Sequence, residues 1–313
     1  MSLVSVVIPY RNRAAFLAKT LQSVVDSDYR PLELLLVNNH STDNSEEVAR
    51  AFFKSHSVEN VTIHYLNEEK PGAAVARNRG LQEVSGEMVY FFDSDDELSP
   101  DFFSWAVATL REHDADVVAT ATRMVWPDGC ETLRKYLKRL TLSGQILTGQ
   151  LATQSMFFRT EWLRQQGGWN ASVRFWDDWE LGVRVLLSRP KMVWDACRVY
   201  HHVLQHDDSL TGTSLSASFA SLTVAFESVE TQLRSDVTLA GRAKRRAWRA
   251  LAYREAIVAG TLFTEGHADD ARRTLNRALG IAPDRSSRMF SRILYHYTRC
   301  GGRGAWRIAL WGC

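Results

Sequence analysis

The sequence predicts an α/β protein in which a mostly parallel sheet is covered by helices on both faces and is followed by an all-α region. Three observations support this prediction. Short runs rich in Val, Ile, Leu and aromatic residues alternate with helix-like segments over the first two thirds of the chain. Runs that are apolar throughout are typical of strands buried on both faces of a parallel sheet. From about residue 215 onward, strand-like runs give way to a helical pattern.

Four apolar runs predict the first strands. They are LVSVVIP (3–9), LELLLVN (32–38), VTIHYL (61–66) and EMVYFFD (87–93). The segments between them predict helices that cross from one parallel strand to the next, at 14–27, 42–55 and 73–84. Later strands are expected at 115–125 and 154–159. TEWLRQQGG is expected to form a short helix closed by glycine, and 178–188 a further helix.

The two parts of the chain differ in charge. Residues 240–313 contain 15 Lys+Arg and 5 Asp+Glu, a net charge of +10. Residues 1–239 therefore contain 23 Lys+Arg and 31 Asp+Glu, a net charge of −8. The stretch TGTSLSAS is small and polar, as expected of a linker. We therefore expect one domain over 1–214 and a basic helical region over 215–313.

The composition excludes several classes of protein. With 45% hydrophobic and 24% charged residues, the chain is expected to fold rather than to be disordered. Four scattered cysteines without a C-x-x-C pair fit neither a disulfide framework nor a zinc cluster, which favours a reducing, cytoplasmic compartment. The run LVSVVIP is too short for a signal peptide, and no run reaches the roughly 18 apolar residues of a membrane span.

Four acidic residues within five positions follow the fourth predicted strand: Asp93, Asp95, Asp96 and Glu97. Ligands bind at the carboxyl ends of parallel strands, and carboxylates this close repel unless water or a cation screens them. A helix start explains one acid or two, and we expect Asp96 and Glu97 to belong to it. The three aspartates together favour a Mg²⁺ or Mn²⁺ site whose remaining ligands come from a diphosphate.

Six motifs in order resemble those of family 2 glycosyltransferases, which have the GT-A fold. They are VSVVIPYRNR, ELLLVNNHSTDNS, PGAAVARNRGL, SGEMVYFFDSDDELSPDFF, GGWNASVRFWDDWELGVRV and HDDSL. The resemblance covers about residues 3–212 and excludes the C-terminal region. It implies an inverting, metal-dependent transfer of a sugar from a nucleotide-diphosphate donor, a UDP-sugar, to an acceptor hydroxyl. The expected product is a bacterial-type surface polysaccharide or glycolipid.

The D-x-D motif of the family implies the ligands of the metal. Asp95 would be the main ligand, with Asp93 near the ribose or the metal and Ser94 beside the nucleotide. His206 stands where many family members place a histidine, and it would bind the metal or the diphosphate. A structural role is the alternative for this histidine, and His201 and His202 compete with it for the assignment.

The nucleotide pocket departs from the family in one place. Pro9, Tyr10 and Arg11 would complete the base pocket, with Tyr10 available to stack on the ring. Arg77 is expected to contact the nucleotide or the diphosphate, with a surface position on its helix as the alternative. Where the family usually shows V-D-D-G-S, this chain has VNNHS, so Asn39 replaces the acid that accepts from uracil. Its amide oxygen still accepts, but its NH₂ also donates, which weakens the preference for uracil.

The motif RFWDDWELGVR begins another predicted helix with two adjacent acids. In the family, the second acid of such a pair deprotonates the acceptor, which implies Asp178 as the base and Asp177 as its supporting acid. Adjacent carboxylates beside Trp176 and Trp179 would raise one pKa toward neutrality through desolvation and like charge. The alternative is an aspartate N-cap with an acidic first turn.

The basic C-terminal region suggests two further features. Residues 248–283 resemble a single tetratricopeptide unit, which predicts either a helical hairpin packed on the catalytic domain or a partner-binding groove. Farther on, arginines alternate with aromatic residues, as in helices that lie on anionic membranes. The aromatic residues are Tyr295, Tyr297, Trp306 and Trp311. We expect a membrane surface carrying a lipid-linked acceptor, on the inner face of the cell membrane, rather than nucleic acid, a protein partner or a merely solvated helical face.

Two other functions stay open from the sequence. A nucleotidyltransferase also pairs a doubly wound sheet with a two-carboxylate metal site, but PYRNRAAF lacks the glycine-rich phosphate loop that it needs. A catalytically degenerate domain that serves as a scaffold is favoured by Asn38 and Asn39, whereas the intact Asp95 and Asp178 oppose it.

Overall fold

The computed structural model describes residues 1–56, 58–133, 137–205 and 214–312, which form two compact units. The first unit takes its described residues from 1–139, 151–171 and 189–205. The second takes them from 140–150, 172–188 and the C-terminal part from 214 onward. Each unit has its own hydrophobic core.

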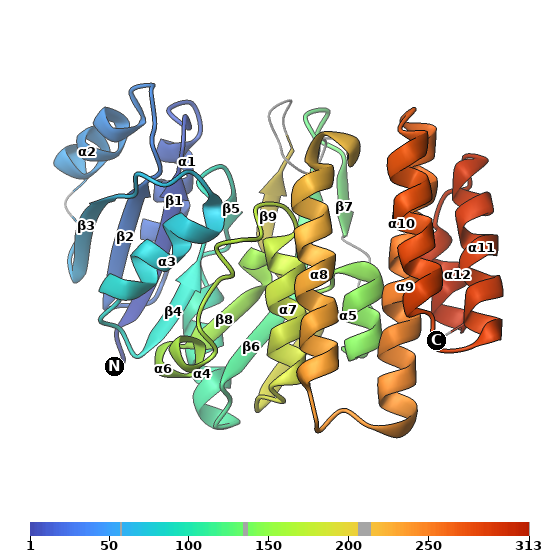
Figure 1. Cartoon of the computed structure of the whole chain (residues 1–313). Coiled ribbons are helices and arrows are strands. Elements are labelled where there is room, and N and C mark those ends of the chain that lie inside the picture. Colours follow the sequence, from blue (N-terminus) through green and yellow to red (C-terminus); the bar gives the residue numbers. More distant parts are fainter. Residues whose placement is uncertain (57, 134–136, 206–213, 313) are drawn as a thin grey trace. The chain divides into compact units, whose positions relative to one another are not determined.

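The first unit is built on a nine-stranded sheet (Figure 1). Its strand order is β3-β2-β1-β4-β8-β6-β9-β5, and β7 pairs with β6. The strands are β1 (Val4–Tyr10), β2 (Leu32–Asn38), β3 (Val61–Asn67), β4 (Met88–Phe91), β5 (Glu97–Leu98), β6 (Val117–Val125), β7 (Glu131–Leu133), β8 (Met156–Arg159) and β9 (Met192–Leu204). The four strands β3, β2, β1 and β4 are parallel, whereas β8 runs antiparallel to both β4 and β6.

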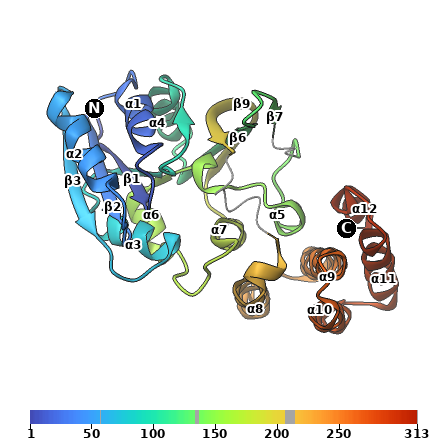
Figure 2. The same ribbon diagram turned by 90° about the horizontal axis from the view of Figure 1, so that it is seen from above.

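Helices cover both faces of this sheet. They are α1 (Leu17–Val25), α2 (Ser45–Ser55), α3 (Ala73–Glu83), α4 (Phe102–Glu112) and α6 (Thr160–Gln165). In Figure 2, α1 and α4 lie on one side of the strands and α3 and α6 on the other. Side chains alternate between the faces of a strand, so Val6 of β1 packs in the cluster that contains Leu21 of α1, while Val7 faces Gly80 of α3. The α/β fold with both faces covered is therefore confirmed.

The second unit is all-helical in its described residues. Its helices are α5 (Leu142–Thr148), α7 (Asp177–Leu187), α8 (Phe219–Ser235), α9 (Gly241–Thr264), α10 (Ala268–Ile281), α11 (Arg285–Arg299) and α12 (Ala305–Gly312). The long helix α9 contacts α5, α8, α10, α11 and α12. The repeat-like segment 248–283 folds as the hairpin of α9 and α10. The predicted helical C-terminal region is thus confirmed, and no described helix has both the length and the apolar character needed to cross a bilayer.

The bounds of the units differ from the two domains predicted from the sequence. Helices α5 and α7 come from within 1–214, yet their residues share a core with α8 and α9. Ile146 and Trp179 pack in one cluster with Phe226 and Leu251. The second unit therefore includes two segments that precede residue 215, and the boundary near 214 stays a prediction about the linear sequence.

Candidate active site

The loop after β4 carries three aspartates at the edge of the sheet where the parallel strands β1 and β2 also end. The side chains of Asp93 and Asp95 are 32% and 18% exposed. Asp96 is only 2% exposed. Two carboxylates therefore face solvent, while the third lies in the interior.

Two arginines neutralise the solvent-facing carboxylates. Arg77 of α3 donates from Nη2 to Asp93 Oδ1 at 2.8 Å, and its guanidinium lies 4.4 Å from the centre of the Trp169 ring. Arg77 is 5% exposed, so it is not an arginine of the helix surface. Arg13, just after β1, donates from Nε to Asp95 Oδ2 at 3.2 Å. The chain itself thus supplies the positive charge that keeps these carboxylates together.

Gln154 joins two of the aspartates. Its Nε2 donates to Asp93 Oδ2 and to Asp96 Oδ2, both at 2.6 Å. The backbone N–H of Leu204 in β9 donates to the other oxygen of Asp96 at 3.0 Å. Burial raises the pKa of the Asp96 carboxyl well above its ordinary value, and the charges of Asp93 and Asp95 raise it further. Asp96 is therefore a structural member of the acidic loop.

The expectation that Asp96 and Glu97 begin a helix is wrong. Glu97 starts the two-residue strand β5, which pairs with β9, and its carboxylate forms an ion pair with Lys19. Helix α4 begins only at Phe102, and the preceding Asp101 makes no side-chain cap. A helix start therefore explains none of the three aspartates.

The two exposed carboxylates fit a Mg²⁺ or Mn²⁺ ion. Both are hard oxygen ligands two positions apart on one loop, and Mg²⁺ commonly takes one or two carboxylates together with substrate phosphates. Among the residues the structure describes, no group of three or more His, Cys, Asp or Glu side chains is arranged to hold a metal. His206 lies outside the described residues. Among the described residues, Asp93 and Asp95 are thus the two carboxylates that could hold such an ion.

The two histidines that competed with His206 lie in β9. His201 is fully buried, and its Nδ1 is 2.8 Å from the Tyr90 hydroxyl. Burial lowers the pKa of His201 to about 3, so the ring is neutral. The pKa of the half-buried His202 is also lowered, chiefly by burial. His201 is a core residue of the sheet rather than part of the acidic loop.

The residues expected to form the base pocket differ in exposure. Pro9 and Tyr10 end β1, and Tyr10 is 2% exposed within the core cluster. Burial raises the pKa of the Tyr10 phenol, and stacking of this ring on a base stays a prediction. Arg11 is exposed just beyond the strand, and Ser94 is buried between Asp93 and Asp95.

Asn39 forms hydrogen bonds that hold the loop leading from β3 to α3. Its Nδ2 donates to the carbonyls of Glu68 and Lys70 at 3.1 and 2.8 Å, and its Oδ1 accepts from the N–H of Gly72 at 2.9 Å. A carboxylate at this position could not donate to the two carbonyls. The amide that replaces the usual acid therefore matches the backbone around it, and its oxygen keeps one lone pair for a further donor.

In the second unit, Asp177 and Asp178 form the first turn of α7. The residue before them, Trp176, has a left-handed conformation with φ of 61° and makes no side-chain cap, so neither aspartate is the N-cap. Asp177 Oδ1 accepts the N–H of Asp178 at 3.0 Å, and Asp178 Oδ1 accepts the N–H of Trp179 at 2.7 Å. Both aspartates are partly exposed.

Two tryptophans fix this turn. The guanidinium carbon of Arg254 lies 4.2 Å from the centre of the Trp176 ring, a cation–π contact. The buried Trp179 donates its indole N–H to the carbonyl of Ile146 at 2.9 Å. These contacts anchor α7 to α9 and α5. Trp176 and Trp179 therefore fix the first turn of α7 through their own contacts. Neither contact involves the carboxylates of Asp177 and Asp178.

Sequence patterns did not single out Arg13 and Gln154, which bond the acidic loop, or Trp169, whose ring lies against Arg77. Arg13 and Trp169 stand inside the quoted motifs PYRNR and GGWN, so their position in a motif was an available signal. Gln154 is 61 residues from Asp93 and 58 from Asp96 along the chain, and no local pattern marks it.

Comparison with known proteins gives a consistent result. The model of the family described as "Glycosyl transferase family 2" matches residues 5–165. The chain is 30% identical over 145 residues to the uncharacterized glycosyltransferase YibD of Escherichia coli, covering 46% of this chain and 41% of that protein. It is 33% identical over 113 residues to a GalNAc(5)-diNAcBac-PP-undecaprenol beta-1,3-glucosyltransferase of Campylobacter jejuni, covering 36% and 34%. The chain spans less than half the length of both relatives.

Solved structures share the fold. Residues 1–349 of TarS from S. aureus in complex with UDP superpose with a TM-score of 0.70 at 18% identity, covering 99% of this chain and 90% of that one. The mannosyltransferase PcManGT from Pyrobaculum calidifontis, in complex with GDP-Man and Mn²⁺, gives a TM-score of 0.56 at 17% identity, covering 99% and 87%. At this level of identity the likeness shows the fold alone.

Proposed function

Because the chain belongs to glycosyl transferase family 2, we propose that it transfers a sugar from a nucleotide-diphosphate donor to an acceptor hydroxyl in the synthesis of a bacterial surface polysaccharide or glycolipid. One observation carries this proposal. Asp93 and Asp95 are held at the carboxyl edge of the sheet, partly exposed, by Arg77, Arg13 and Gln154 from three other segments. Such a loop has the hard oxygen atoms and the nearby cations that a diphosphate leaving group requires.

The proposed donor is a UDP-sugar bound to the first unit. TarS, which shares the fold, has been solved with UDP and with UDP-GlcNAc. In our proposal Asp95 is the main ligand of a divalent cation and Asp93 lies near the ribose or the cation. When bound, that cation supplies charge neutralisation to the departing diphosphate. The buried Arg77 orients Asp93, and the more exposed Arg13 is available to a phosphate oxygen.

The proposed base is Asp178 in the second unit. It would accept the proton of the attacking hydroxyl, while Asp177, whose Oδ1 accepts the N–H of Asp178, supports the turn. A single displacement of the nucleotide diphosphate by that hydroxyl inverts the anomeric carbon, so we expect an inverting enzyme. The names of relatives that act on undecaprenol-linked glycans and in teichuronic acid biosynthesis support a glycan or lipid-linked acceptor.

The test is a hydrolysis and transfer screen across nucleotide sugars with Mn²⁺. We expect turnover of at least one UDP-sugar by the wild type and a loss on the order of 100-fold or more in Asp95→Ala, because a group that stabilises the leaving charge is removed. Asp101→Ala is the matched control, since Asp101 is exposed and makes no cap. Equal turnover by wild type and Asp95→Ala would contradict the assignment.

Calorimetry of UDP binding with and without Mn²⁺ separates the remaining functions. Metal-dependent binding of UDP together with sugar transfer supports the proposal. Metal-dependent binding without turnover of any nucleotide sugar would favour a scaffold. Release of pyrophosphate from a nucleoside triphosphate and a sugar phosphate would favour a nucleotidyltransferase.

A further inference from the structure

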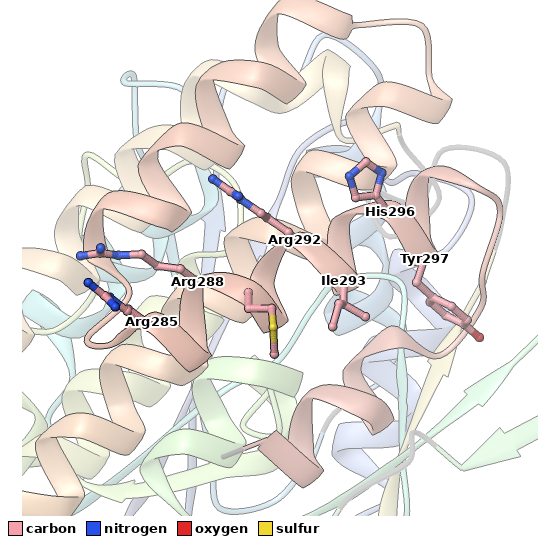
Figure 3. A pocket seen from close by; sticks show the side chains of 7 residues that line it. Arg285, Arg288, Arg292, Ile293, His296 and Tyr297 are labelled. Atoms are coloured by element: carbon pink, nitrogen blue, oxygen red, sulfur yellow. The ribbon is translucent and has the colours of Figure 1, made fainter.

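Helix α11 has an outward face made of two parallel rows of side chains. One row is apolar and consists of Met289, Ile293 and Tyr297, which are 62%, 49% and 39% exposed. The other is basic and consists of Arg288, Arg292 and His296, all exposed (Figure 3). Within each row the residues follow one another at intervals of four, so each row runs along the helix. Together with Arg285 they line a surface depression of about 600 Å³.

The opposite face of α11 packs into the unit. Leu294 and Tyr295 are buried there, and the carbonyl of Tyr295 comes so close to Gly260 of α9 that an added Cβ would be 2.9 Å from it. Tyr295 therefore points inward, which corrects the expectation that it belongs to an exposed aromatic surface. The outward apolar row is thus separate from the face that the fold uses.

The charged side chains of α11, α12 and the loop between them are all basic. Residues 285–312 contain six arginines and no lysine, aspartate or glutamate. In the part of the chain that the structure describes, no ion pair joins the arginines of the outward face, Arg285, Arg288 and Arg292, to an acid. On the neighbouring α10, by contrast, Arg272 and Arg273 pair with aspartates one turn away.

Helix α12, which contacts α11, also carries an exposed aromatic and an exposed basic side chain. Trp311 is 93% exposed and Arg307 is exposed as well. An exposed indole is costly in water but favourable at the boundary between headgroups and acyl chains. The two helices therefore combine unpaired arginines with exposed Met, Ile, Tyr and Trp side chains.

We propose that the outward face of α11, together with the exposed Trp311 of α12, binds the surface of an anionic lipid bilayer. Arginines pair with lipid phosphates, and the apolar row enters the headgroup boundary with α11 lying in the plane of the membrane. With 15 residues, α11 presents a face about 22 Å long. Charge complementarity selects this occupant. Nucleic acid needs only the basic row and leaves the apolar row unexplained, and a second copy that docked through the same face would bring like charges together.

The test is sedimentation of the full chain with vesicles of phosphatidylcholine, alone or mixed with phosphatidylglycerol, at two salt concentrations. We expect binding only to the mixed vesicles and weaker binding at high salt. Arg288→Gln with Arg292→Gln should weaken binding about 30-fold, since each arginine near an anionic surface contributes roughly fivefold. Met289→Ser with Ile293→Ser should also weaken binding, which a purely electrostatic contact would not show.

Arg272→Gln with Arg273→Gln on α10 is the matched control, because it removes the same charge from an exposed but paired position. We expect it to bind vesicles like the wild type. Equal loss in the control and in the α11 variant would overturn the proposal, as would equal binding to both kinds of vesicle. Binding of a single-stranded RNA without vesicle binding, or a dimer that forms through α11, would overturn it as well. The experiment uses no nucleotide sugar, so its result is independent of the proposed transfer.

Discussion

Gln154 joins two aspartates of the acidic loop through one side-chain nitrogen. A single amide nitrogen bonds both the partly exposed Asp93 and the buried Asp96. It thereby couples a proposed ligand of the cation to a carboxyl that is fixed in the interior. Groups that orient metal ligands commonly affect affinity almost as much as the ligands do.

We expect Gln154→Leu to weaken Mn²⁺-dependent binding of UDP by about 10–100-fold, because Asp93 loses the donor that aims its carboxylate. Calorimetry with and without Mn²⁺ measures this change. Gln165→Leu, at an exposed position at the end of α6, is the control and should bind like the wild type. Unchanged metal-dependent binding in Gln154→Leu would show that Gln154 serves stability alone.

At the scale of single residues, the sequence predicted which acidic residues form the candidate site but not which side chains bond to them. Asp93 and Asp95 were predictable as a cluster, because four acids directly after a buried strand are rare without a ligand. The arginines and the glutamine that hold them were not predictable from spacing, since Arg13 lies 82 residues from Asp95 along the chain. Only the pairing of strands brings such residues to one edge.

The contact between α3 and β1 shows how closely the elements of the first unit pack. A Cβ on Gly80 would lie 2.3 Å from a methyl group of Val7, so the glycine permits the helix to approach the strand. This approach also places Arg77, one turn earlier on the same helix, where it bonds Asp93.

We therefore expect Gly80→Ala to lower the free energy of unfolding by about 1–3 kcal/mol, since overpacking outweighs the gain in helix propensity. Gly280→Ala in α10 is the matched control. Nothing lies within 4 Å of its added Cβ, so this change should raise the free energy of unfolding by up to about 1 kcal/mol. Urea unfolding measures both, and effects of the same sign would contradict the packing argument.

Helices α8, α9 and α10 meet at a cluster of charged side chains in which Glu255 is buried. Arg277 of α10 donates to Glu255 of α9 at 3.1 Å and to Glu227 and Glu230 of α8 at 3.2 and 2.8 Å. One guanidinium thus faces three carboxylates. Burial raises the pKa of Glu255 to about 8, because desolvation outweighs the attraction of Arg277 and the other two glutamates oppose ionisation.

This pKa makes the stability of the second unit depend on pH. The folded chain keeps the Glu255 proton up to about pH 8, whereas an unfolded glutamate loses it near 4.5. Between these values the folded state binds more protons, so the free energy of unfolding falls as the pH rises, by at most about 1.4 kcal/mol per unit. Glu255→Gln should therefore gain stability relative to the wild type from pH 6 to pH 8. Urea unfolding at several pH values measures the difference, and Glu69→Gln is the exposed control.

Sequence patterns missed several short elements and also the 13-residue strand β9, whose pairing with β6 shifts register between Thr120 and Thr122. Strand β5 has two residues and β7 has three, so neither offers an alternation of side chains that a pattern could detect. Helix α5 has only seven residues, and it begins at a cap in which Thr141 Oγ1 accepts the N–H of Gly144 at 3.0 Å. The longer predicted strands and helices agree with the structure within three residues at each end, because their apolar periodicity matches their burial.

For the whole molecule, the proposal assigns donor binding to Asp93 and Asp95 and proton acceptance to Asp178. We expect Asp178→Asn to bind UDP with Mn²⁺ as the wild type does and to lose transfer by about 10²–10⁴-fold, because an amide of the same shape cannot accept the proton. Asp177→Asn should lose less transfer activity, since the asparagine retains the side-chain oxygen that accepts the Asp178 N–H. Calorimetry and a transfer assay on the same preparations test both, and intact transfer in Asp178→Asn would refute its role.

The set of chain segments that make up the second unit could not be predicted from the linear order of residues. The motifs pointed to one domain up to 214, and the basic helices were expected to follow it as a separate region. Ile146 of α5 and Trp179 of α7 instead share a core with Leu251 of α9. Their burial is a property of three distant segments, which no local pattern reports.

This discontinuity has a consequence for synthesis of the protein on the ribosome. Helix α7 ends at Leu187, and α8, which packs against it, ends at Ser235, so 48 residues are added between the completion of α7 and that of α8. At usual rates of elongation this takes roughly 2–10 s. During that interval the apolar side of α7 lacks α8, whose Phe226 packs against Trp179 in the folded unit. The nascent chain is thus expected to need a chaperone at this stage, and slower translation of residues 188–235 is expected to lower its yield.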